Sequence, residues 1–419
     1  MASRRRFLVS SAAMLLSSPT RVFSGETQVQ GVMANAPFDQ SAALQQAIEE
    51  AAAAGRALHL PPGVFRAGGL WLPRNAVLAG MPGTVLQAVG AGPILSVDGV
   101  ETARLTGLTF RGISAVSDTG LLEVSDCPAF EIDHCRFAST GGRGLVLFRA
   151  GGKVSDNHFD VCRGAAIASL DATGLRIEGN RIENCDNLGL YVERQVPGPD
   201  GTIIRANRIR TIRWGEGGDG PNGNGINVFR AQGVIVADNV IDDCAFSAIR
   251  LNATRNAIVR ANLCSRSQEV AIFSEFGFSG SVISDNIIDG AATGIAITNF
   301  DTGGRLATCS GNIVRNIYAR STTNPDTTPV GISAKADTIL TGNLVENVPG
   351  IGLALGWGHY LKNVSATGNV LRGCEIGIGI SVVAGVGTTL VADNLVAVPQ
   401  GGRRYCRHGM GPRDRARSG

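Results

Sequence analysis

The stretch GVIVADNVIDDCAFSAIRLN, residues 233–252, sets the pattern for most of this chain. An apolar triplet precedes Ala-Asp-Asn, two aliphatic residues follow, and a small residue with Ile comes nine positions after Asn239. The outline returns along the chain, often at a step of about 23 to 24 residues. Its asparagines are Asn157, Asn180, Asn207, Asn239, Asn262, Asn286, Asn312, Asn343, Asn369 and Asn394. A fixed period of about 20 to 50 residues is typical of a solenoid or a propeller.

The content of one repeat selects between these two architectures. Each repeat holds three short alternating strands separated by Gly, Asn and Asp turns, and no helix. One turn of a parallel β-helix has that content. Coils would stack at about 4.8 Å, with alternate residues pointing inward as an apolar column. The expected column contains Ile182, Ile209, Ile241 and Ile288. The sequence therefore predicts an all-β, single-stranded parallel β-helix.

The repeated asparagines are interpreted as a structural device. Asparagine tolerates the left-handed conformation of a tight turn, and stacked amides can hydrogen-bond from coil to coil. We therefore expect Asn157, Asn180, Asn207, Asn239, Asn262 and Asn286 to form a ladder. Cys162, Cys185, Cys244 and Cys374 each follow an asparagine by five residues. They are expected to be small buried side chains, and a Cys162–Cys185 disulfide is the alternative.

Both ends of the repeat region differ from its middle. Residues 37–57 read as one amphipathic helix, with Asp39 or Ser41 as N-cap and a stripe of Leu44, Ala47, Ile48 and Ala51. The helix is predicted to cover the open first coil of a β-helix that spans 58–398. Residues 399–419 lack strand periodicity, and 401–419 contains six arginines, so we predict a disordered basic tail.

The first residues indicate export. Ser3 to Leu8, which include Arg4 and Arg5, resemble a twin-arginine signal, and the alternative is an ordinary secretory signal. The apolar run that follows is too short to cross a bilayer. Residues 1–36 are therefore expected to be a signal and leader read by the twin-arginine export machinery. The mature chain should be periplasmic or extracellular, with no membrane span.

Composition narrows the function classes. Charged residues are 17% of the chain and the net charge is +3, so nothing favours nucleic-acid binding. No CxxC pair and no Cys/His cluster has zinc spacing. The sequence predicts no metal site and indicates no cofactor, although calcium stays open as a cofactor.

A resemblance adds to this reading. The helix is followed by Leu58-His-Leu-Pro-Pro-Gly-Val-Phe65 and then by coils of V-x-x-N-x-I and G-I-x-[IV]. This order resembles the pectate-lyase-like superfamily of right-handed parallel β-helices over about residues 38–398. Joined to the signal, it is similar to a bacterial family of twin-arginine-exported β-helix repeat proteins to which no reaction is assigned. The resemblance implies the right-handed fold. It leaves the reaction open, because lyases, hydrolases, epimerases and adhesins share that fold.

Insertions interrupt the repeat on either side of the Gly-Ile strands. The run from Asn207 to Gly225 is 18 residues and that from Asn312 to Gly331 is 19, against eight or nine elsewhere. Longer stretches also follow the Gly-Ile strands at 193–201, 300–306 and 357–360. Loops on a rigid scaffold commonly carry function. We therefore expect a face with a loop wall on each side.

Alternation gives the outward residues of that face, which mix aromatic, amide and charged side chains. Substrate-binding candidates are Tyr191, Glu193, Asn227, Phe229, Arg230, Asn252 and Phe273, with Trp214, Glu216 and Asp219 from the first loop. Ser333 and Lys335 also point outward. Aromatic rings, amides and charges together suit sugars. The alternative is an ordinary polar β-surface.

Arg250 and Glu275, on adjacent coils, are the catalytic candidates for lysis or epimerisation of an acidic, uronate-containing glycan. A cross-strand ion pair is the alternative for these two residues. A non-catalytic envelope or surface β-helix that binds glycan or protein is the rival function, and glycoside hydrolysis is a further alternative. Glu193 and Glu275 are three coils, roughly 14 Å, apart, which is too far for a hydrolase pair.

Overall fold

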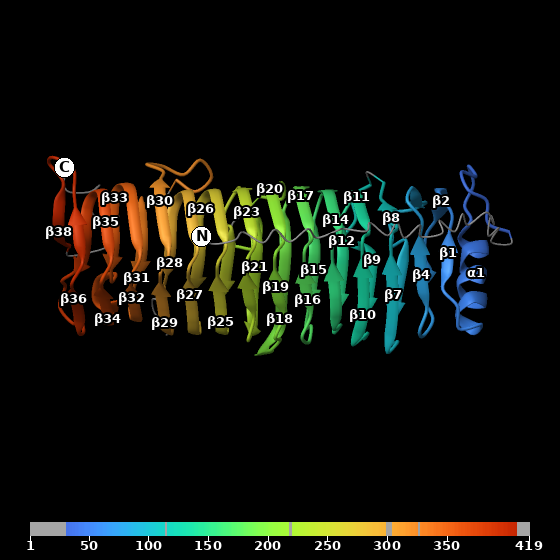
Figure 1. The fold of residues 1–419 in the computed structure, drawn as a ribbon, viewed down its shortest axis with the longest axis horizontal. Helices are drawn as coiled ribbons and strands as arrows, with labels where there is room; N and C mark the ends of the chain where they lie inside the picture. The colour runs from blue at the N-terminus through green and yellow to red at the C-terminus, as the bar shows by residue number, and fades with distance from the viewer. Residues whose placement is uncertain (1–30, 114, 218–219, 299–303, 326, 409–419) are drawn as a thin grey trace, which may run out of the picture.

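The computed structural model describes residues 31–113, 115–217, 220–298, 304–325 and 327–408. The chain winds into a right-handed parallel β-solenoid of about 13 turns, in which every strand pairs in parallel with strands of the neighbouring coils. Figure 1 shows one long rod, with helix α1 (Ser41–Ala53) at one end and β38 at the other. The predicted fold class is confirmed.

Three parallel sheets form the sides of the rod, and each coil contributes to all three. Sheet 1 consists of β1 (Leu58–Leu60), β4 (Val77–Gly80), β7 (Thr102–Thr106), β10 (Ala129–Asp133), β13 (Gly152–Ser155), β16 (Arg176–Glu178), β19 (Ile203–Arg205), β22 (Ile235–Ala237), β25 (Arg255–Arg260), β27 (Ser279–Ser284), β29 (Arg305–Ser310), β32 (Ala336–Thr341), β34 (Lys362–Thr367) and β36 (Thr389–Ala392). Sheet 2 has β2 (Gly63–Ala67), β5 (Thr84–Ala88), β8 (Thr109–Arg111), β11 (Arg136–Thr140), β14 (His158–Cys162), β17 (Arg181–Cys185), β20 (Arg208–Ile212), β23 (Val240–Cys244), β30 (Ile313–Ile317) and β37 (Leu395–Ala397).

Sheet 3 carries the Gly-Ile strands. Its members are β3 (Leu70–Trp71), β6 (Leu95–Asp98), β9 (Gly120–Ser125), β12 (Arg143–Phe148), β15 (Ala165–Leu170), β18 (Leu188–Pro199), β21 (Asn224–Gln232), β24 (Ile249–Asn252), β31 (Val330–Ala334) and β38 (Arg403–His408). Four long strands run through sheets 2 and 3 without a break, namely β26 (Leu263–Glu275), β28 (Ile287–Ile297), β33 (Leu344–Leu355) and β35 (Val370–Ser381). Sheet 3 therefore shares strands with sheet 2 in its later coils.

Helix α1 closes the first coil as predicted. Leu44, Ala47, Ile48 and Ala51 are all buried against the first strands. The predicted N-cap is wrong, because Gln40 occupies that position. The Gln40 Oε1 atom accepts a bond from the Met33 amide at 2.7 Å, while Asp39 Oδ1 accepts the Ser41 amide at 2.8 Å.

The interior is filled by side chains stacked from coil to coil. Ile182, Ile209 and Ile241 are in register, followed by Cys264 and then Ile288. Earlier in the same column, Phe110, Phe137 and Phe159 stack with ring centroids 5.0 and 4.5 Å apart. The apolar column predicted by alternation is therefore continuous over these coils.

The asparagine ladder is present and buried. From Asn157 to Asn369, each Nδ2 donates to Oδ1 of the asparagine on the next coil at 2.9–3.1 Å. The same oxygen accepts the backbone amide of the preceding asparagine, as in Asn239 N to Asn262 Oδ1 at 3.0 Å. One expectation is wrong: the left-handed residue is the one before the asparagine, such as Asp238 or Ala261. The bend before the asparagine turns the amide inward, where it satisfies buried backbone groups.

The cysteines and the C-terminal segment complete the fold. All nine cysteines are free thiols, and eight of them are buried. The chain beyond 398 was expected to be disordered, but residues 403–408 form β38, in register with β35. Alternating pairs such as Ile378 with Tyr405 continue sheet 3 by one further strand. Within the described residues, no helix is both long enough and apolar enough to cross a membrane.

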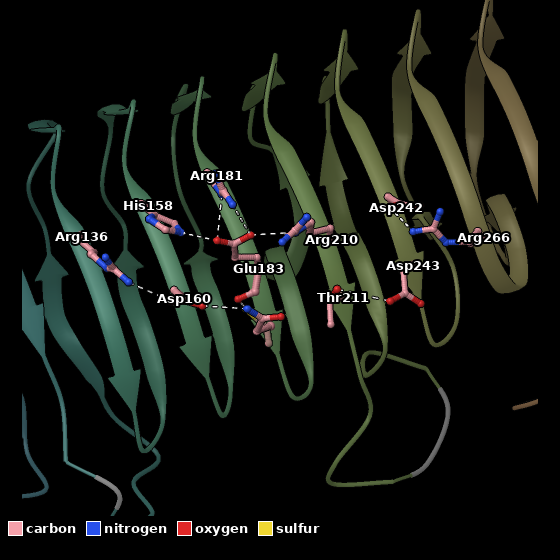
Figure 2. Close-up of polar contacts among 12 residues, drawn as sticks. Arg136, His158, Asp160, Arg181, Glu183, Arg210, Thr211, Asp242, Asp243 and Arg266 are labelled. Carbon is pink, nitrogen blue, oxygen red and sulfur yellow. Dashed lines mark hydrogen bonds and ion pairs between the residues drawn. The ribbon is translucent and has the colours of Figure 1, made fainter.

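The column three residues after each asparagine is an ion-pair ladder on sheet 2 (Figure 2). Glu183 lies at its centre and accepts bonds from Arg181, Arg210 and His158 at 2.8 to 3.0 Å. Glu183 is only 5% exposed, while its arginine partners lie in solvent. Burial alone would raise the pKa of Glu183, but Arg181 and His158 outweigh it and lower the pKa to about 2.

Candidate functional site

The site face is the outer surface of β18, β21, β24 and β26 in sheet 3. Two outward rows of side chains cross these strands in register. The first row contains Tyr191, Asn227, Arg250 and Phe273, and the second contains Glu193, Phe229, Asn252 and Glu275. Side chains of successive strand residues alternate between faces, so residues counted as outward from the sequence do share one face. The assignment of these rows is confirmed.

Arg250 and Glu275 form a buried ion pair at the centre of the face. Arg250 Nε lies 2.6 Å from Glu275 Oε1, and the side chain of Asn252 donates to the same oxygen at 3.0 Å. Arg250 Nη1 donates to the carbonyl oxygen of Gly220 at 2.9 Å. The two charged residues are only 8% and 3% exposed. The cross-strand ion pair left open by the sequence is therefore present, and it is held out of solvent.

A second carboxylate, that of Glu269, joins this pair. It lies near the middle of β26 and is 6% exposed. Its Oε2 accepts the Ser247 hydroxyl at 3.1 Å and lies 4.0 Å from Arg250 Nη1, while Oε1 accepts the Asn324 amide at 3.1 Å. Sequence reasoning missed Glu269, because the outward residues were counted forward from each Gly-Ile pair. An acidic residue directly before the apolar run Val270–Ile272 was the available signal.

Two long loops close over the cluster. The loop at 318–329 follows β30 but folds back toward β26, as Figure 1 shows at the upper edge of the rod. Thr323 Oγ1 donates to the Ala245 carbonyl at 2.6 Å, Thr322 Oγ1 donates to Gln268 Oε1 at 2.9 Å, and the Ser321 hydroxyl donates to the Gln268 carbonyl. These bonds bring the Asn324 side chain to Glu269, although its loop comes two coils after the strand that carries Glu269.

The loop at 213–223 leaves from the same corner of the solenoid, between sheet 2 and sheet 3. Trp214 packs edge-on against Phe246 with ring centroids 5.7 Å apart, and the Glu216 amide donates to Asn187 Oδ1 at 2.9 Å. The Glu216 side chain points into solvent rather than into the cluster, since the residue is exposed. Asp219, which the sequence analysis named as a substrate-binding candidate, lies outside the described residues.

The remaining predicted residues surround the cluster at different depths. The Arg230 guanidinium stacks over the Phe229 ring at 4.4 Å and donates to the Gln195 carbonyl at 3.2 Å, so it is turned away from Arg250. Asn227 is 4% exposed, and within the described residues its Oδ1 has no hydrogen-bond partner. Tyr191 and Glu193 are half-buried further along the face. The structure thus gathers Arg250, Asn252 and Glu275, with Phe273 beside them at 5.4 Å from the guanidinium.

A lysine extends the second row. Backbone bonds place Thr298 and then Lys335 on the coils after Glu275. Lys335 is 7% exposed, and its Nζ lies 4.6 Å from the centre of the Trp357 ring. Burial lowers the pKa of Lys335 to about 8. The sequence placed Lys335 on this face but could not show that it is buried.

Burial has the opposite effect on Glu275. It raises the pKa of the carboxyl, against the charge and hydrogen bond of Arg250, and the nearby Glu269 adds to the rise. Glu275 is thus easier to protonate, and Lys335 easier to deprotonate, than either group in water. A carboxyl with a raised pKa and an amine with a lowered pKa thus lie on one row, two coils apart. Within the described ranges, no three His, Cys, Asp or Glu side chains gather closely enough to hold a metal ion.

Comparison with protein families decides the membership of the chain. The family described as right handed beta helix region matches residues 93–220 and 195–306, which together span just over half of the 419 residues. The chain belongs to this β-helix family. None of the curated protein sequences matches the chain.

Several solved structures are similar to the chain over most of its length. The A-module of the mannuronan C-5 epimerase AlgE4 from Azotobacter vinelandii is 16% identical, with a TM-score of 0.46, over 91% of this chain and 96% of that one. An exopolygalacturonase from Thermotoga maritima is 13% identical, with a TM-score of 0.48, over 88% and 90%. The surface protein and adhesin PfbA of Streptococcus pneumoniae is 12% identical, with a TM-score of 0.43, over 90% and 98%.

Proposed function

We propose that this β-helix protein is exported, binds an acidic polysaccharide along the site face, and acts on a uronate residue by elimination or epimerisation. The observation that carries the proposal is the set of Arg250, Glu269, Glu275 and Lys335, each less than 9% exposed on one outer face. Taking charges out of water costs stability, and a solenoid does not need them on its outer surface. Buried charges with perturbed pKa values are typical of functional sites.

The roles follow from the contacts. Elimination or epimerisation removes the proton next to the uronate carboxylate, so the site needs a base and positive charge. Lys335 supplies the base, because its pKa of about 8 leaves part of the amine neutral near physiological pH. Arg250 supplies charge from a fixed position, because Glu275 and Gly220 already bind two of its nitrogens. Glu275 serves as the proton donor of the site. Phe273 and Trp357 offer ring faces for the C–H surface of a sugar.

Glycoside hydrolysis is the second candidate, and the position of Glu269 favours it. Glu269 and Glu275 approach different nitrogens of one guanidinium, at 4.0 and 2.6 Å. Because a guanidinium is small and planar, the two carboxyls are separated by less than about 9.5 Å, the upper limit for hydrolase pairs. The sequence analysis excluded Glu193 and Glu275 as a hydrolase pair because their carboxyls are too far apart. Glu269 and Glu275 are close enough to meet the distance requirement.

The test is a panel of glycans with the mature chain from residue 37. Pectate, alginate, glycosaminoglycans and neutral glucans would be incubated with and without calcium. Ultraviolet absorbance would detect the unsaturated products of elimination, and new reducing ends would detect hydrolysis. Deuterium taken up by the sugar from heavy water would detect epimerisation. Arg250→Ala and Lys335→Gln should each lower turnover of a uronate polymer by about a hundredfold or more. The matched control is Arg210→Ala, which removes an exposed arginine from the ladder of Figure 2 and should leave turnover unchanged.

The outcomes separate the candidates. Reducing ends that form without unsaturated product, and vanish in Glu269→Gln, would replace the lyase with a hydrolase. Saturable glycan binding without any product would leave a non-catalytic binding protein. Equal activity of Arg250→Ala and Arg210→Ala would show that the cluster is structural.

A further inference from the structure

The first row of the site face continues beyond β18, β21, β24 and β26. One more residue stands in register before Tyr191, on β15, and three more follow Phe273, on β28, β31 and β33. The added members of this extended first row are Ala168, Ala296, Ser333 and Ala354. Seven register steps of about 4.8 Å make the row roughly 34 Å long. The row is therefore long enough for several sugar residues of one glycan.

The extended first row is recessed, although its side chains point away from the core. The side chain of Arg250 is 10% exposed, whereas those of Arg181 and Arg210, which also point outward but on sheet 2, are 56% and 59% exposed. Apart from its two aromatic residues, every member of the row is at most 9% exposed, namely Ala168, Asn227, Arg250, Ala296, Ser333 and Ala354. The surrounding segments therefore rise above the row, and the loop at 213–223 contributes through Gly220, which binds Arg250.

Two aromatic rings interrupt the recessed row. Tyr191 and Phe273 are half-buried and lie three register steps apart, which corresponds to about 14 Å. The faces of aromatic rings suit the C–H surfaces of sugar rings. Phe273 lies beside Arg250, whereas Tyr191 marks a separate position two coils earlier.

Tyr191 rests on an apolar cluster of its own. Ala165, Ala168 and Leu188 form this cluster, which is buried yet separate from the core, and Tyr191 packs against it. The cluster supports the ring from one side, so the part of the ring that stays exposed is held in place for a ligand. Burial and the charge of Glu193 raise the pKa of Tyr191, so its hydroxyl stays protonated and can donate to a sugar oxygen.

The buried charges lie in the middle of the extended first row. Three strands carry the row before Arg250, namely β15, β18 and β21, and three carry it after the strand of Glu275, namely β28, β31 and β33. A sugar residue in an extended glycan advances by close to one coil spacing, about 4.8 Å. A glycan bound along the row would therefore have sugars on both sides of Arg250 and Glu275, whereas action at a chain end needs sugars on one side only.

We propose that Tyr191 forms a distal sugar subsite, and that the protein binds internal stretches of a long uronate-containing glycan along the extended first row. The inference rests on the proposed function, because the same face binds the same acidic glycan. Each occupied position adds contacts, so affinity should rise with the length of the bound chain until the row is filled. Binding at the charged cluster alone would give no such rise.

Calorimetric titration of the mature chain with oligosaccharides from dimers to octamers, cut from pectate, alginate and hyaluronan, tests the subsite. In the series that binds, affinity should rise from the dimer to the hexamer. Tyr191→Leu keeps the apolar cluster covered but removes the ring, so it should weaken hexamer binding about five- to tenfold. It should leave the dimer, which the charged cluster holds, unaffected.

Two further variants control for the ring and for the fold. Tyr191→Phe keeps the ring and should retain most of the affinity gained with length. Phe38→Leu removes a 56% exposed aromatic residue that precedes α1, and it should bind every oligosaccharide like the unmodified chain.

Stoichiometry on the intact polymer tests internal binding without any variant. At saturation, sedimentation velocity should show more protein molecules on each long chain than the chain has ends. Affinity that does not depend on length, a Tyr191→Leu chain that binds like the unmodified one, or saturation at one protein per chain end would overturn the inference and leave the proposed function standing. If no uronate polymer binds, the proposed function fails together with it.

Discussion

At the residue scale, neighbours decide how a charged side chain behaves in this solenoid. Glu183 and Glu275 are both buried glutamates on outer strand positions, yet their pKa values move in opposite directions. Glu183 has three basic partners, which outweigh the effect of burial. Glu275 has one arginine and an acidic neighbour, so burial prevails and the pKa rises. The first arrangement stabilises a coil stack, and the second suits proton transfer.

The ion pairs of Glu183 predict a pH dependence of stability. Its pKa in the folded chain, about 2, lies below its ordinary value of 4.5. The contribution is therefore complete above pH 4.5 and is lost as the pH falls toward 2. Because the arginines are exposed and screened, Glu183→Gln should destabilise the chain by about 1 to 2 kcal/mol at pH 6. Urea unfolding at several pH values would measure this difference, which should shrink toward zero near pH 2.

The control for that series is Glu346→Gln. Glu346 is more exposed and pairs with one arginine, Arg372, at 3.4 Å. Its replacement should change the free energy of unfolding by less than about 0.5 kcal/mol at any pH. A Glu183→Gln effect that stays constant between pH 6 and pH 2 would mean that packing, not charge, stabilises this position.

At the element scale, α1 and the loop at 318–329 show what the repeat itself cannot supply. Every inner coil is covered by its neighbours, but the first coil needs a separate element, and α1 provides its apolar stripe. Hydroxyl groups of the loop at 318–329 donate hydrogen bonds to Ala245 and Gln268. One element protects the core and the other brings Asn324 to the site.

The cap predicts a local effect on unfolding. Leu44 is 1% exposed, so Leu44→Ala should lower the free energy of the first unfolding transition by about 2 to 4 kcal/mol. Gln46→Ala, on the exposed side of the same helix, should change it by less than about 0.5 kcal/mol. Differential scanning calorimetry would resolve the transition. Equal effects of the two substitutions would show that α1 does not close the core.

At the scale of the whole molecule, the same buried columns run along the entire rod while the outside varies. Cysteines fit into these columns as small apolar side chains. Burial raises the pKa of most of them, for example that of Cys264 to about 12, which keeps the thiols protonated and unreactive.

Thiol alkylation followed by intact-mass analysis tests this arrangement. In the native chain only Cys406, which is half-buried, should be modified, giving one adduct. After unfolding without reductant, all nine cysteines should react. If Cys162 and Cys185 instead form a disulfide, only seven adducts should appear. Adding reductant should then raise the number to nine.

The repeat pattern is enough to predict the coil. A repeat with strand alternation and inward asparagines allows one stacking, so the sheet rows, the capping helix and the pairing of Arg250 with Glu275 followed from counting residues. The course of the loops could not be predicted, because a loop has no period and depends on contacts with distant residues, such as that of Thr323 with Ala245. The back-folded loop joins Asn324 to Glu269, and burial of the cluster gives Glu275 and Lys335 their shifted pKa values. The burial of a residue depends on every segment packed over it, including the loops. A repeat pattern predicts only which residues lie next to it on the neighbouring coil.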